Sequence, residues 1–246
     1  MEYTVVIRTL GTAGDKYQRE LNSLCAQTIP PKEILVYIAE GYSIPKESCG
    51  REHYIRVKKG MVRQRALRYD EVTTDYILFL DDDVYLPSDG VEKLHRALKE
   101  YDVNVVSPDV FDNASRCLRA EMQMALSGRM IARKGDAIWA YKVISTAGYS
   151  YNKRPQNRAY LSQTNAGPCF FCRKSDFLKI KFQEELWLDQ MGYPIGEDQI
   201  MFYKMYLNGL TQLTVFGTGI EHLDAGKNLG NKEKELKLIE GDYFFS

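Results

Sequence analysis

Short apolar runs alternate along the first hundred residues with segments whose apolar side chains recur at helical spacing, and this alternation constrains the fold more than any other feature. Strands are expected at 3–7, 33–38, 76–80 and 103–107. Helices are expected at 15–27, at 61–69, and from Ser88, a suitable N-cap, through Tyr101. Such alternation forms right-handed β-α-β units. It predicts an α/β fold with a Rossmann-like, mainly parallel central sheet flanked by helices.

The second half of the chain has a less regular pattern. Residues 112–160 show no clear period, which indicates long connections around a site. The later pattern predicts a strand and a short helix within 166–180, a helix within 195–210 that starts near Glu197, and a strand at 211–217. A single domain over 1–246 is expected. The aromatic ending GDYFFS favours a C-terminally truncated chain.

Composition argues against several classes of protein. Lys and Arg number 33, as do Asp and Glu, and hydrophobic residues make up 44% of the chain. This balance is ordinary for a globular protein and gives no overall attraction to nucleic acid or to anionic membranes. The start MEYTVVIRTL does not resemble a signal peptide, and no apolar run approaches the roughly 20 residues that span a bilayer. We therefore expect a cytoplasmic protein, with peripheral association at the inner face of a membrane left open.

Charge is nevertheless uneven along the chain. Between 112 and 158, nine basic residues stand against three acidic ones, so this segment carries +6 and the remainder −6. The basic residues are Arg116, Arg119, Arg129, Arg133, Lys134, Lys142, Lys153, Arg154 and Arg158. A solvated loop face and a surface that faces an anion explain the segment equally well.

The cysteines favour reduced thiols. Five cysteines are an odd number, without the density of a disulfide scaffold. Cys169 and Cys172 form a lone C-x-x-C inside the apolar run PCFFC, with no second pair. Buried strand thiols are therefore favoured over a zinc or redox site.

Three adjacent carboxylates, Asp81, Asp82 and Asp83, follow directly after the strand expected at 76–80. In open parallel sheets, ligands gather beyond the carboxyl ends of the strands. A D-x-D pair there suits Mg²⁺ or Mn²⁺, which prefer carboxylate oxygens and keep positions open for phosphate. A solvated turn is the alternative, but turn chemistry does not require three carboxylates after a buried strand.

Several further blocks occur in a definite order along the sequence. The segment RTLGTAGDKYQRELNSLCAQTIPPKEILVYIAEG, with Leu21, Leu24, Gln27, Glu33 and Ile34 at the matching positions, resembles the opening of the family 2 glycosyltransferases. Arg65 then precedes Asp81 of YILFLDDD by 16 residues, and GEDQIMFYKMYLNG resembles the acid pair that opens a late helix in the family. The resemblance covers roughly residues 3 to 222, and the ordered combination is far more specific than any single block.

The resemblance implies a GT-A fold and an inverting reaction. A nucleotide-diphosphate sugar, with a UDP-sugar favoured, would donate its sugar to a hydroxyl of a glycan or lipid-linked acceptor, in cell-surface polysaccharide synthesis. Residues 1–110 would then form the half that binds the nucleotide sugar, and residues 111–246 the half that binds the acceptor.

The resemblance also implies roles for particular residues. The donor would be bound by Thr9, Glu40, Arg65, Asp81 and Asp82. A divalent metal, Mn²⁺ or Mg²⁺, would be held by Asp83, Asp81 and His222, and would screen the charge that develops on the leaving diphosphate. Asp198, with Glu197 beside it, would be the general base that takes the proton of the acceptor hydroxyl.

Several of these residues also fit ordinary structural roles. Acidic side chains are favoured at any helix N-terminus, which by itself accounts for Glu197 and Asp198. His222 fits an ordinary hydrogen-bonding role as well as metal binding. Only Glu40 is available to read the nucleotide base, where the family usually has two acids, and Lys204 stands where an Arg is common.

Other functions stay open at this point. ILFLDDDV also fits a phosphohydrolase of the haloacid dehalogenase type, with Asp81 as nucleophile and Asp83 as acid/base, although that motif normally follows the first strand. A sugar-nucleotide pyrophosphorylase would need an early Gly-rich segment that is absent here. A non-catalytic carbohydrate-binding domain is the non-enzymatic alternative. Trp187, just before the acid pair, fits a wall that faces the acceptor.

Overall fold

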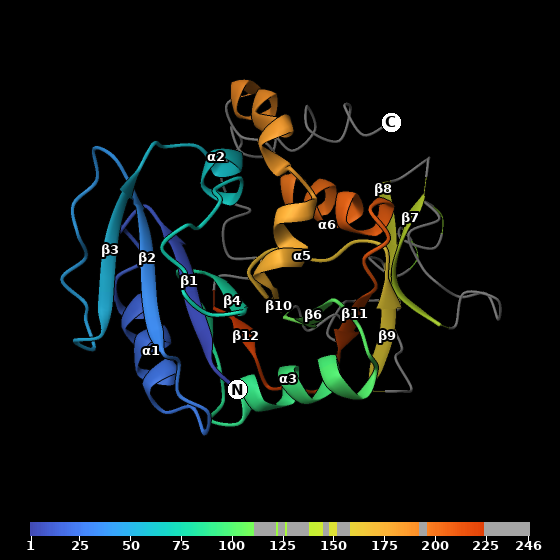
Figure 1. Cartoon of the computed structure of the whole chain (residues 1–246), viewed down its shortest axis with the longest axis horizontal. Coiled ribbons are helices and arrows are strands. Elements are labelled where there is room, and N and C mark those ends of the chain that lie inside the picture. The colour runs from blue at the N-terminus through green and yellow to red at the C-terminus, as the bar shows by residue number, and fades with distance from the viewer. Residues whose placement is uncertain are drawn as a thin grey trace.

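The computed structural model describes residues 1–110, 138–144, 148–151, 158–191 and 196–223, together with Met122 and Leu126. Its centre is a sheet of ten described strands in the order β3-β2-β1-β4-β10-β6-β11-β9-β7-β8 (Figure 1). These strands are β1 (Tyr3–Thr9), β2 (Glu33–Ala39), β3 (Glu52–Val57), β4 (Tyr76–Asp81), β6 (Val105–Pro108), β7 (Trp139–Ile144), β8 (Gly148–Tyr151), β9 (Ala159–Ser162), β10 (Cys169–Arg173) and β11 (Gln212–Val215). A separate two-stranded sheet joins β5 (Val84–Tyr85) to β12 (Glu221–His222).

The part of the sheet formed by the first half of the chain is parallel. β1 pairs in parallel with β2 and with β4, and β2 pairs in parallel with β3. β10 lies antiparallel between β4 and β6, and β6 pairs in parallel with β11. Beyond β11, β9 pairs antiparallel with β11, β7 pairs in parallel with β9, and β8 pairs antiparallel with β7. The predicted α/β fold with a mostly parallel central sheet is confirmed.

Helices cover both faces of this sheet. They are α1 (Asp15–Cys25), α2 (Met61–Arg65), α3 (Gly90–Glu100), α5 (Lys174–Lys179), α6 (Glu197–Leu207) and the 3₁₀ helix η3 (Phe182–Met191). Leu21 of α1 and Leu94 of α3 belong to the core on one face. Val62 of α2, Phe177 of α5 and Phe202 of α6 belong to the core on the other. In Figure 1, α3 lies along the bottom, α2 lies near the top, and α5 and α6 lie near the middle of the view.

The apolar sequence of β4 reflects the burial of both faces of this strand. Leu78 and Leu80 are buried in the core with α1 and α3, while Ile77 and Phe79 are buried in the opposite core. A strand covered on both faces requires apolar side chains at every position, which explains the unbroken run before the carboxylates. The charged residues begin where this cover ends, at Asp81.

Two local expectations were wrong in detail. Ser88 does not cap α3, because the helix begins at Gly90 with Asp89 at the N-cap position and no capping side chain. The helix expected at 61–69 ends at Arg65. Tyr69, within the predicted range, adopts a positive φ of 51° that is not helical, and its hydroxyl donates to the carbonyl of Gln64 in α2.

β3 was not expected from the sequence. It is an edge strand beside β2, and its six residues EHYIRV are half-buried or exposed. A strand with so little burial leaves no apolar run to detect. Because β3 precedes β4, the three carboxylates follow the fourth strand of the chain rather than the third.

Cys169 and Cys172 are buried in β10, as expected. Cys169 belongs to the core with α1 and α3, and Cys172 to the opposite core. Because the sheet separates the two thiols, they cannot bind one metal ion together.

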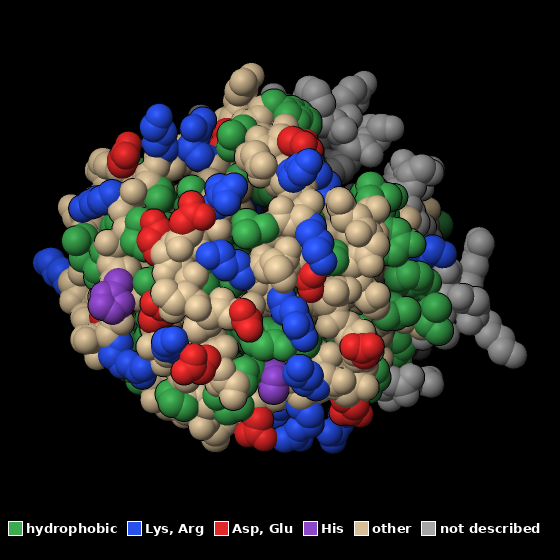
Figure 2. Space-filling view, viewed as in Figure 1, with side chains coloured by type: hydrophobic (Ala, Val, Ile, Leu, Met, Phe, Trp, Pro, Cys, Tyr) green, Lys and Arg blue, Asp and Glu red, His purple; other side chains and the backbone are tan. Residues whose placement is uncertain are grey.

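The described surface carries few further indications of function. No helix among the described residues has the length and apolar character needed to cross a membrane. Over the described surface shown in Figure 2, basic and acidic side chains are intermixed. The basic segment 112–158 lies mostly outside the described residues, so the choice between a solvated face and an anion-facing surface stays open.

Candidate functional site

Asp81, the last residue of β4, lies between two arginines. Its Oδ1 accepts a hydrogen bond from Nη2 of Arg8 at 2.9 Å, and its Oδ2 lies 3.5 Å from Nη2 of Arg65. Both arginines are buried. Two fixed positive charges therefore offset the repulsion among the adjacent carboxylates at this end of the sheet.

Arg8 was not identified from the sequence. It lies in β1, whose register places it directly beside Asp81. Its Nη2 also donates to the carbonyl of Gly167 at 3.1 Å. Burial and the nearby Arg65 charge lower the pKa of Arg8, whereas Asp81 raises it. The available signal was a charged residue in the otherwise uncharged strand YTVVIRT, which a buried carboxylate partner would explain.

Asp82 and Thr9 contact each other at the ends of β4 and β1. Oγ1 of Thr9 donates a short hydrogen bond to Oδ2 of Asp82 and accepts one from the N–H of Gly11 at 2.6 Å. Burial raises the pKa of Asp82 to about 6, and the negative charges of Asp81 and Asp83 act in the same direction. The predicted donor residues Thr9 and Asp82 are therefore adjacent, and their binding role stays a prediction.

Asp83 and His222 are brought together by the small sheet of β5 and β12. His222 pairs with Val84 in the strand register, and the N–H of Leu223 donates to the carbonyl of Asp83 at 2.9 Å. Nε2 of His222 then lies 3.1 Å from Oδ1 of Asp83. Two of the predicted metal ligands, far apart in the chain, thus share one place in the fold.

A divalent cation fits this pair only in part. Among the described residues, no group of three or more His, Cys, Asp or Glu side chains is arranged to hold one metal ion. The third predicted ligand, Asp81, faces Arg8 and Arg65 instead. Mg²⁺ is often held by one or two carboxylates and completed by substrate phosphates and water, and the Asp83 carboxylate suits that arrangement. Ligation by Asp83, Asp81 and His222 stays a prediction.

Glu197 and Asp198 open α6 beside the same arginine. Oε1 of Glu197 lies 3.3 Å from Nη2 of Arg65. Asp198 accepts two backbone hydrogen bonds of 2.8 Å, at Oδ2 from Gly167 and at Oδ1 from Gln199. Burial raises the pKa of both carboxyls, to about 8 for Glu197, while the charge of Arg65 opposes the rise. Arg65 thus links the end of β4 to the start of α6.

Gly167 allows these groups to approach one another. A Cβ atom at this position would lie 2.8 Å from Cβ of Asp198 and 3.1 Å from Nη2 of Arg65. Its N–H and carbonyl bind Asp198 and Arg8, so the backbone itself is part of the site. The sequence offered no signal for Gly167 beyond its place in NAGPCFF.

Three further residues singled out in the sequence lie apart from this charged cluster. Glu40 is exposed just after β2, and its N–H donates to Val57 of the neighbouring edge strand. Lys204 of α6 pairs with Glu184 and Glu185 of η3, at 3.0 and 2.7 Å. Trp187 is 49% exposed on η3. Binding of the base by Glu40 and of the acceptor by Trp187 stay predictions.

Comparison with known proteins identifies a family. The family model described as Glycosyl transferase family 2 matches residues 5–180, which is well over half of the chain. A search of the curated proteins found no match. The matched range contains Arg8, Arg65, the three aspartates and Gly167, and it ends before Glu197.

Proposed function

The chain belongs to glycosyl transferase family 2, and from this premise we propose that it is an inverting, metal-dependent transferase with a UDP-sugar as donor. Membership itself makes the protein a glycosyltransferase, with the α/β architecture of the GT-A fold. The proposed acceptor is a hydroxyl of a glycan or of a lipid-linked sugar in cell-surface polysaccharide synthesis. The proposed place of action is the cytoplasm or the inner face of a membrane.

The proposal rests chiefly on the position of Arg65. Its Nη2 lies within 3.5 Å of Asp81 and within 3.3 Å of Glu197, the residue next to Asp198. The end of β4 and the start of α6 therefore face one buried cation. A donor held at the aspartates and a base carried by α6 would then be close enough to act on the same atoms.

The donor-side residues have distinct parts in this proposal. Arg8 and Arg65 fix the Asp81 carboxylate, and Thr9 fixes that of Asp82. These carboxylates would accept hydrogen bonds from the hydroxyl groups of the ribose. Asp83 and His222 would hold a divalent cation, which supplies positive charge against the leaving diphosphate when it is bound.

The proposed transfer is a single displacement. The acceptor oxygen attacks the anomeric carbon and gives its proton to a carboxylate oxygen of Asp198, while the bond from carbon to the diphosphate oxygen breaks and the nucleoside diphosphate leaves with the electron pair. The N–H groups of Gly167 and Gln199 orient the Asp198 carboxylate for this step. Burial raises its pKa, which makes it a stronger base than an exposed aspartate.

A binding screen tests the identity of the donor. Thermal stability would be measured with UDP, GDP, dTDP and CDP, with and without Mn²⁺. We expect stabilisation by UDP that requires Mn²⁺ and exceeds that of the other three. Equal stabilisation by all four nucleotides would contradict the choice of uridine, and stabilisation without the cation would contradict the metal.

Substitution at Asp83 tests catalysis. Release of UDP from UDP-sugars would be compared for the intact protein, for Asp83→Asn and for a control variant, Asp75→Asn. Asp75 is an exposed aspartate directly before β4, at the end of the strand opposite to Asp81. We expect a loss of about a hundredfold or more for Asp83→Asn, in line with removal of a transition-state contact, and no loss for the control. Unchanged metal-dependent turnover in Asp83→Asn would refute the proposal.

The alternatives have their own outcomes in the same assays. A phosphohydrolase that uses Asp81 would release phosphate in a burst from simple phosphomonoesters, which a transferase does not. A non-catalytic carbohydrate-binding domain would bind the donor without turnover in the intact protein. Family membership favours the transferase over both.

A further inference from the structure

One carboxylate connects α2 to a segment from the other half of the chain. Asp189 of η3 accepts two backbone hydrogen bonds from the first turn of α2, at Oδ1 from Val62 at 3.0 Å and at Oδ2 from Arg63 at 2.9 Å. α2 has Gly60 at its N-cap and no capping side chain nearby in sequence. Asp189 therefore supplies, from 126 residues away, the cap that this helix lacks.

Gly60 provides the space for this cap. A Cβ atom at position 60 would overlap Oδ2 of Asp189. Only a residue without a side chain lets the carboxylate approach the first turn so closely. Both segments are therefore shaped for this contact.

α2 needs such support because it is short. It has five residues, Met61–Arg65, and an isolated helix of this length is unstable in water. Towards its other end, Gln64 donates to the carbonyls of Thr9 and Tyr37, at 3.3 and 3.1 Å. The last residue of this short helix is Arg65, the cation between Asp81 and Glu197.

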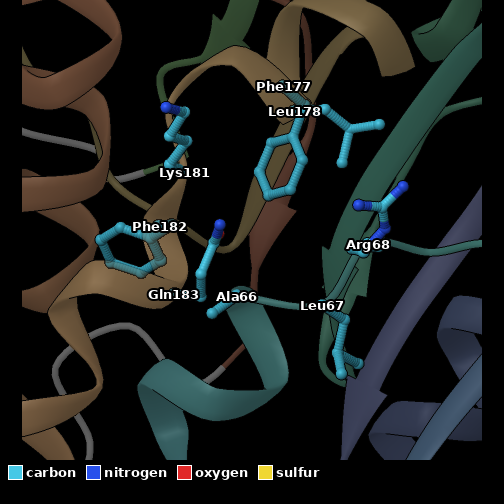
Figure 3. Close-up of a pocket in the computed structure, with 8 residues that line it drawn as sticks. All are labelled: Ala66, Leu67, Arg68, Phe177, Leu178, Lys181, Phe182 and Gln183. Carbon is cyan, nitrogen blue, oxygen red and sulfur yellow. The ribbon is translucent and has the colours of Figure 1, made fainter.

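The residues that follow α2 border a pocket. Its volume is about 120 Å³, with Ala66 and Leu67 on one side and Phe177 and Phe182 on the other (Figure 3). Closely packed side chains hold neighbouring elements in one position, and a gap leaves that constraint weaker. The hydrogen bonds to Asp189 lie at the opposite end of α2 from this pocket.

We propose that Asp189 is a positioning residue for the transfer reaction, and that it holds α2 so that Arg65 stays between Asp81 and Glu197, beside Asp198. The inference rests on the proposed function in one respect, namely that Arg65 and Asp198 take part in transfer. This contact also connects η3, which precedes Asp198 in the chain, to the half that would bind the donor.

The position of Arg65 affects the pKa values of the two carboxyls of α6, Glu197 and Asp198. Arg65 of α2 and Asp81 of β4 face both carboxyls, and Glu197 is also faced by its neighbour Asp198 and by Arg8 of β1. Of these, Arg65 has the largest effect, and it lowers the pKa of both carboxyls. If α2 moves away, both pKa values should rise further, because burial would then be opposed less strongly.

The test compares Asp189→Ala and Asp189→Asn with Glu184→Gln, an exposed carboxyl on the same helix that contacts Lys204 rather than α2. Two measurements need no substrate: amide hydrogen exchange at residues 61–65, and titration of Glu197 and Asp198 followed by carboxyl NMR. We expect faster exchange and higher carboxyl pKa values in Asp189→Ala, smaller changes in Asp189→Asn, which keeps one acceptor, and none in Glu184→Gln.

Kinetics complete the test. For whichever of UDP-glucose, UDP-galactose and UDP-N-acetylglucosamine the intact protein turns over, Asp189→Ala should lower kcat about tenfold or more with little change in KM. The acid limb of its pH profile should move to higher pH. A loss of folded protein alone would lower turnover equally at every pH.

The outcomes separate this inference from the proposed function. Unchanged exchange and unchanged titration in Asp189→Ala would overturn the role of Asp189, whatever the activity. No turnover of any donor by the intact protein would overturn the proposed function and leave both NMR measurements valid. If Asp189→Ala does not fold, Asp189→Asn decides, and Arg65→Lys provides the reference for a weakened cation with α2 still capped.

Discussion

The contacts of Asp81 show how single residues set the balance of charge in the site. Its carboxylate meets Arg8 and Arg65, whose guanidinium groups are both buried. Removing one partner of a buried ion pair leaves a charge without compensation, and such losses commonly cost about 3–5 kcal/mol. The adjacent carboxylates are therefore tolerated because β1 and α2 bring fixed cations to them, even before any metal is considered.

Gly167 gives a prediction at the same scale. Gly167→Ala would place a Cβ 2.8 Å from Cβ of Asp198, so the neighbouring atoms must shift. We expect a loss of stability of about 1–3 kcal/mol from overpacking, together with a loss of turnover of about tenfold or more. The control is Gly90→Ala, whose added Cβ would have its nearest neighbour at 3.4 Å. Urea unfolding and UDP release measure the two effects, and equal behaviour of the two variants would contradict this prediction.

The pH dependence of stability tests the burial of Glu197. Its pKa is raised to about 8 in the folded protein, from an ordinary value near 4.5. Between these values the folded state holds a proton that the unfolded chain has lost, so the free energy of unfolding should fall as pH rises through this window. In Glu197→Gln that part of the slope should disappear. Urea unfolding at several pH values measures it, and an equal slope in both proteins would refute the assignment.

α1 shows how a helix can hold the site in place. Glu20 and Ser23 on this helix, and Gln27 just beyond its C-terminal end, form a row of buried polar side chains. They accept backbone N–H bonds from Val84 at 2.9 Å, from Leu86 at 3.3 Å and from Val91 at 3.0 Å, respectively. These side chains therefore bind the backbone of the segment that follows the three aspartates.

Gln27 is the residue of this row with the most bonds. Its Nε2 also donates to the carbonyls of Ser23 at 2.9 Å and Pro87 at 2.8 Å. Gln27→Ala should cost about 2–4 kcal/mol, because buried partners are left unsatisfied. Asn22→Ala, at an exposed position on α1, should change stability by no more than about 0.5 kcal/mol. Comparable losses of stability in the two variants, measured by urea unfolding, would contradict the prediction that the buried hydrogen bonds of Gln27 cause the loss.

At the scale of the whole molecule, β10 joins the two halves. It comes from the second half of the chain and pairs antiparallel with β4 of the first half and with β6. Phe170 and Phe171, adjacent in β10, are buried in opposite cores. Both cores therefore depend on one strand, which favours a single cooperative unit.

This arrangement predicts a single unfolding transition. Both tryptophans, Trp139 and Trp187, lie in the second half, so their fluorescence reports on that half. Amide exchange in β1 and β2 reports on the first half. We expect both probes to give the same urea midpoint, as two-state unfolding requires. Separate midpoints would contradict the prediction of one domain over 1–246.

Much of the fold could be predicted from local patterns. The helix α6 lies close to where it was expected, and β1, β2 and β4 contain the predicted strands, because burial on both faces leaves an unbroken apolar run. β3 was missed because an edge strand needs no such run. The capping role expected of Ser88 was wrong because several residues near it can precede a helix equally well.

The sequence by itself determined the α/β class and the family resemblance, and it suggested candidate residues for a donor site, because apolar period and residue type are local properties of the chain. Only the tertiary structure decided which residues contact one another. The pairing of Arg8 with Asp81, of His222 with Asp83 and of Asp189 with α2 depends on strand register and helix packing, which bring together segments from 73 to more than 120 residues apart. No local period records such contacts, since each is set by how the whole chain buries its apolar surface.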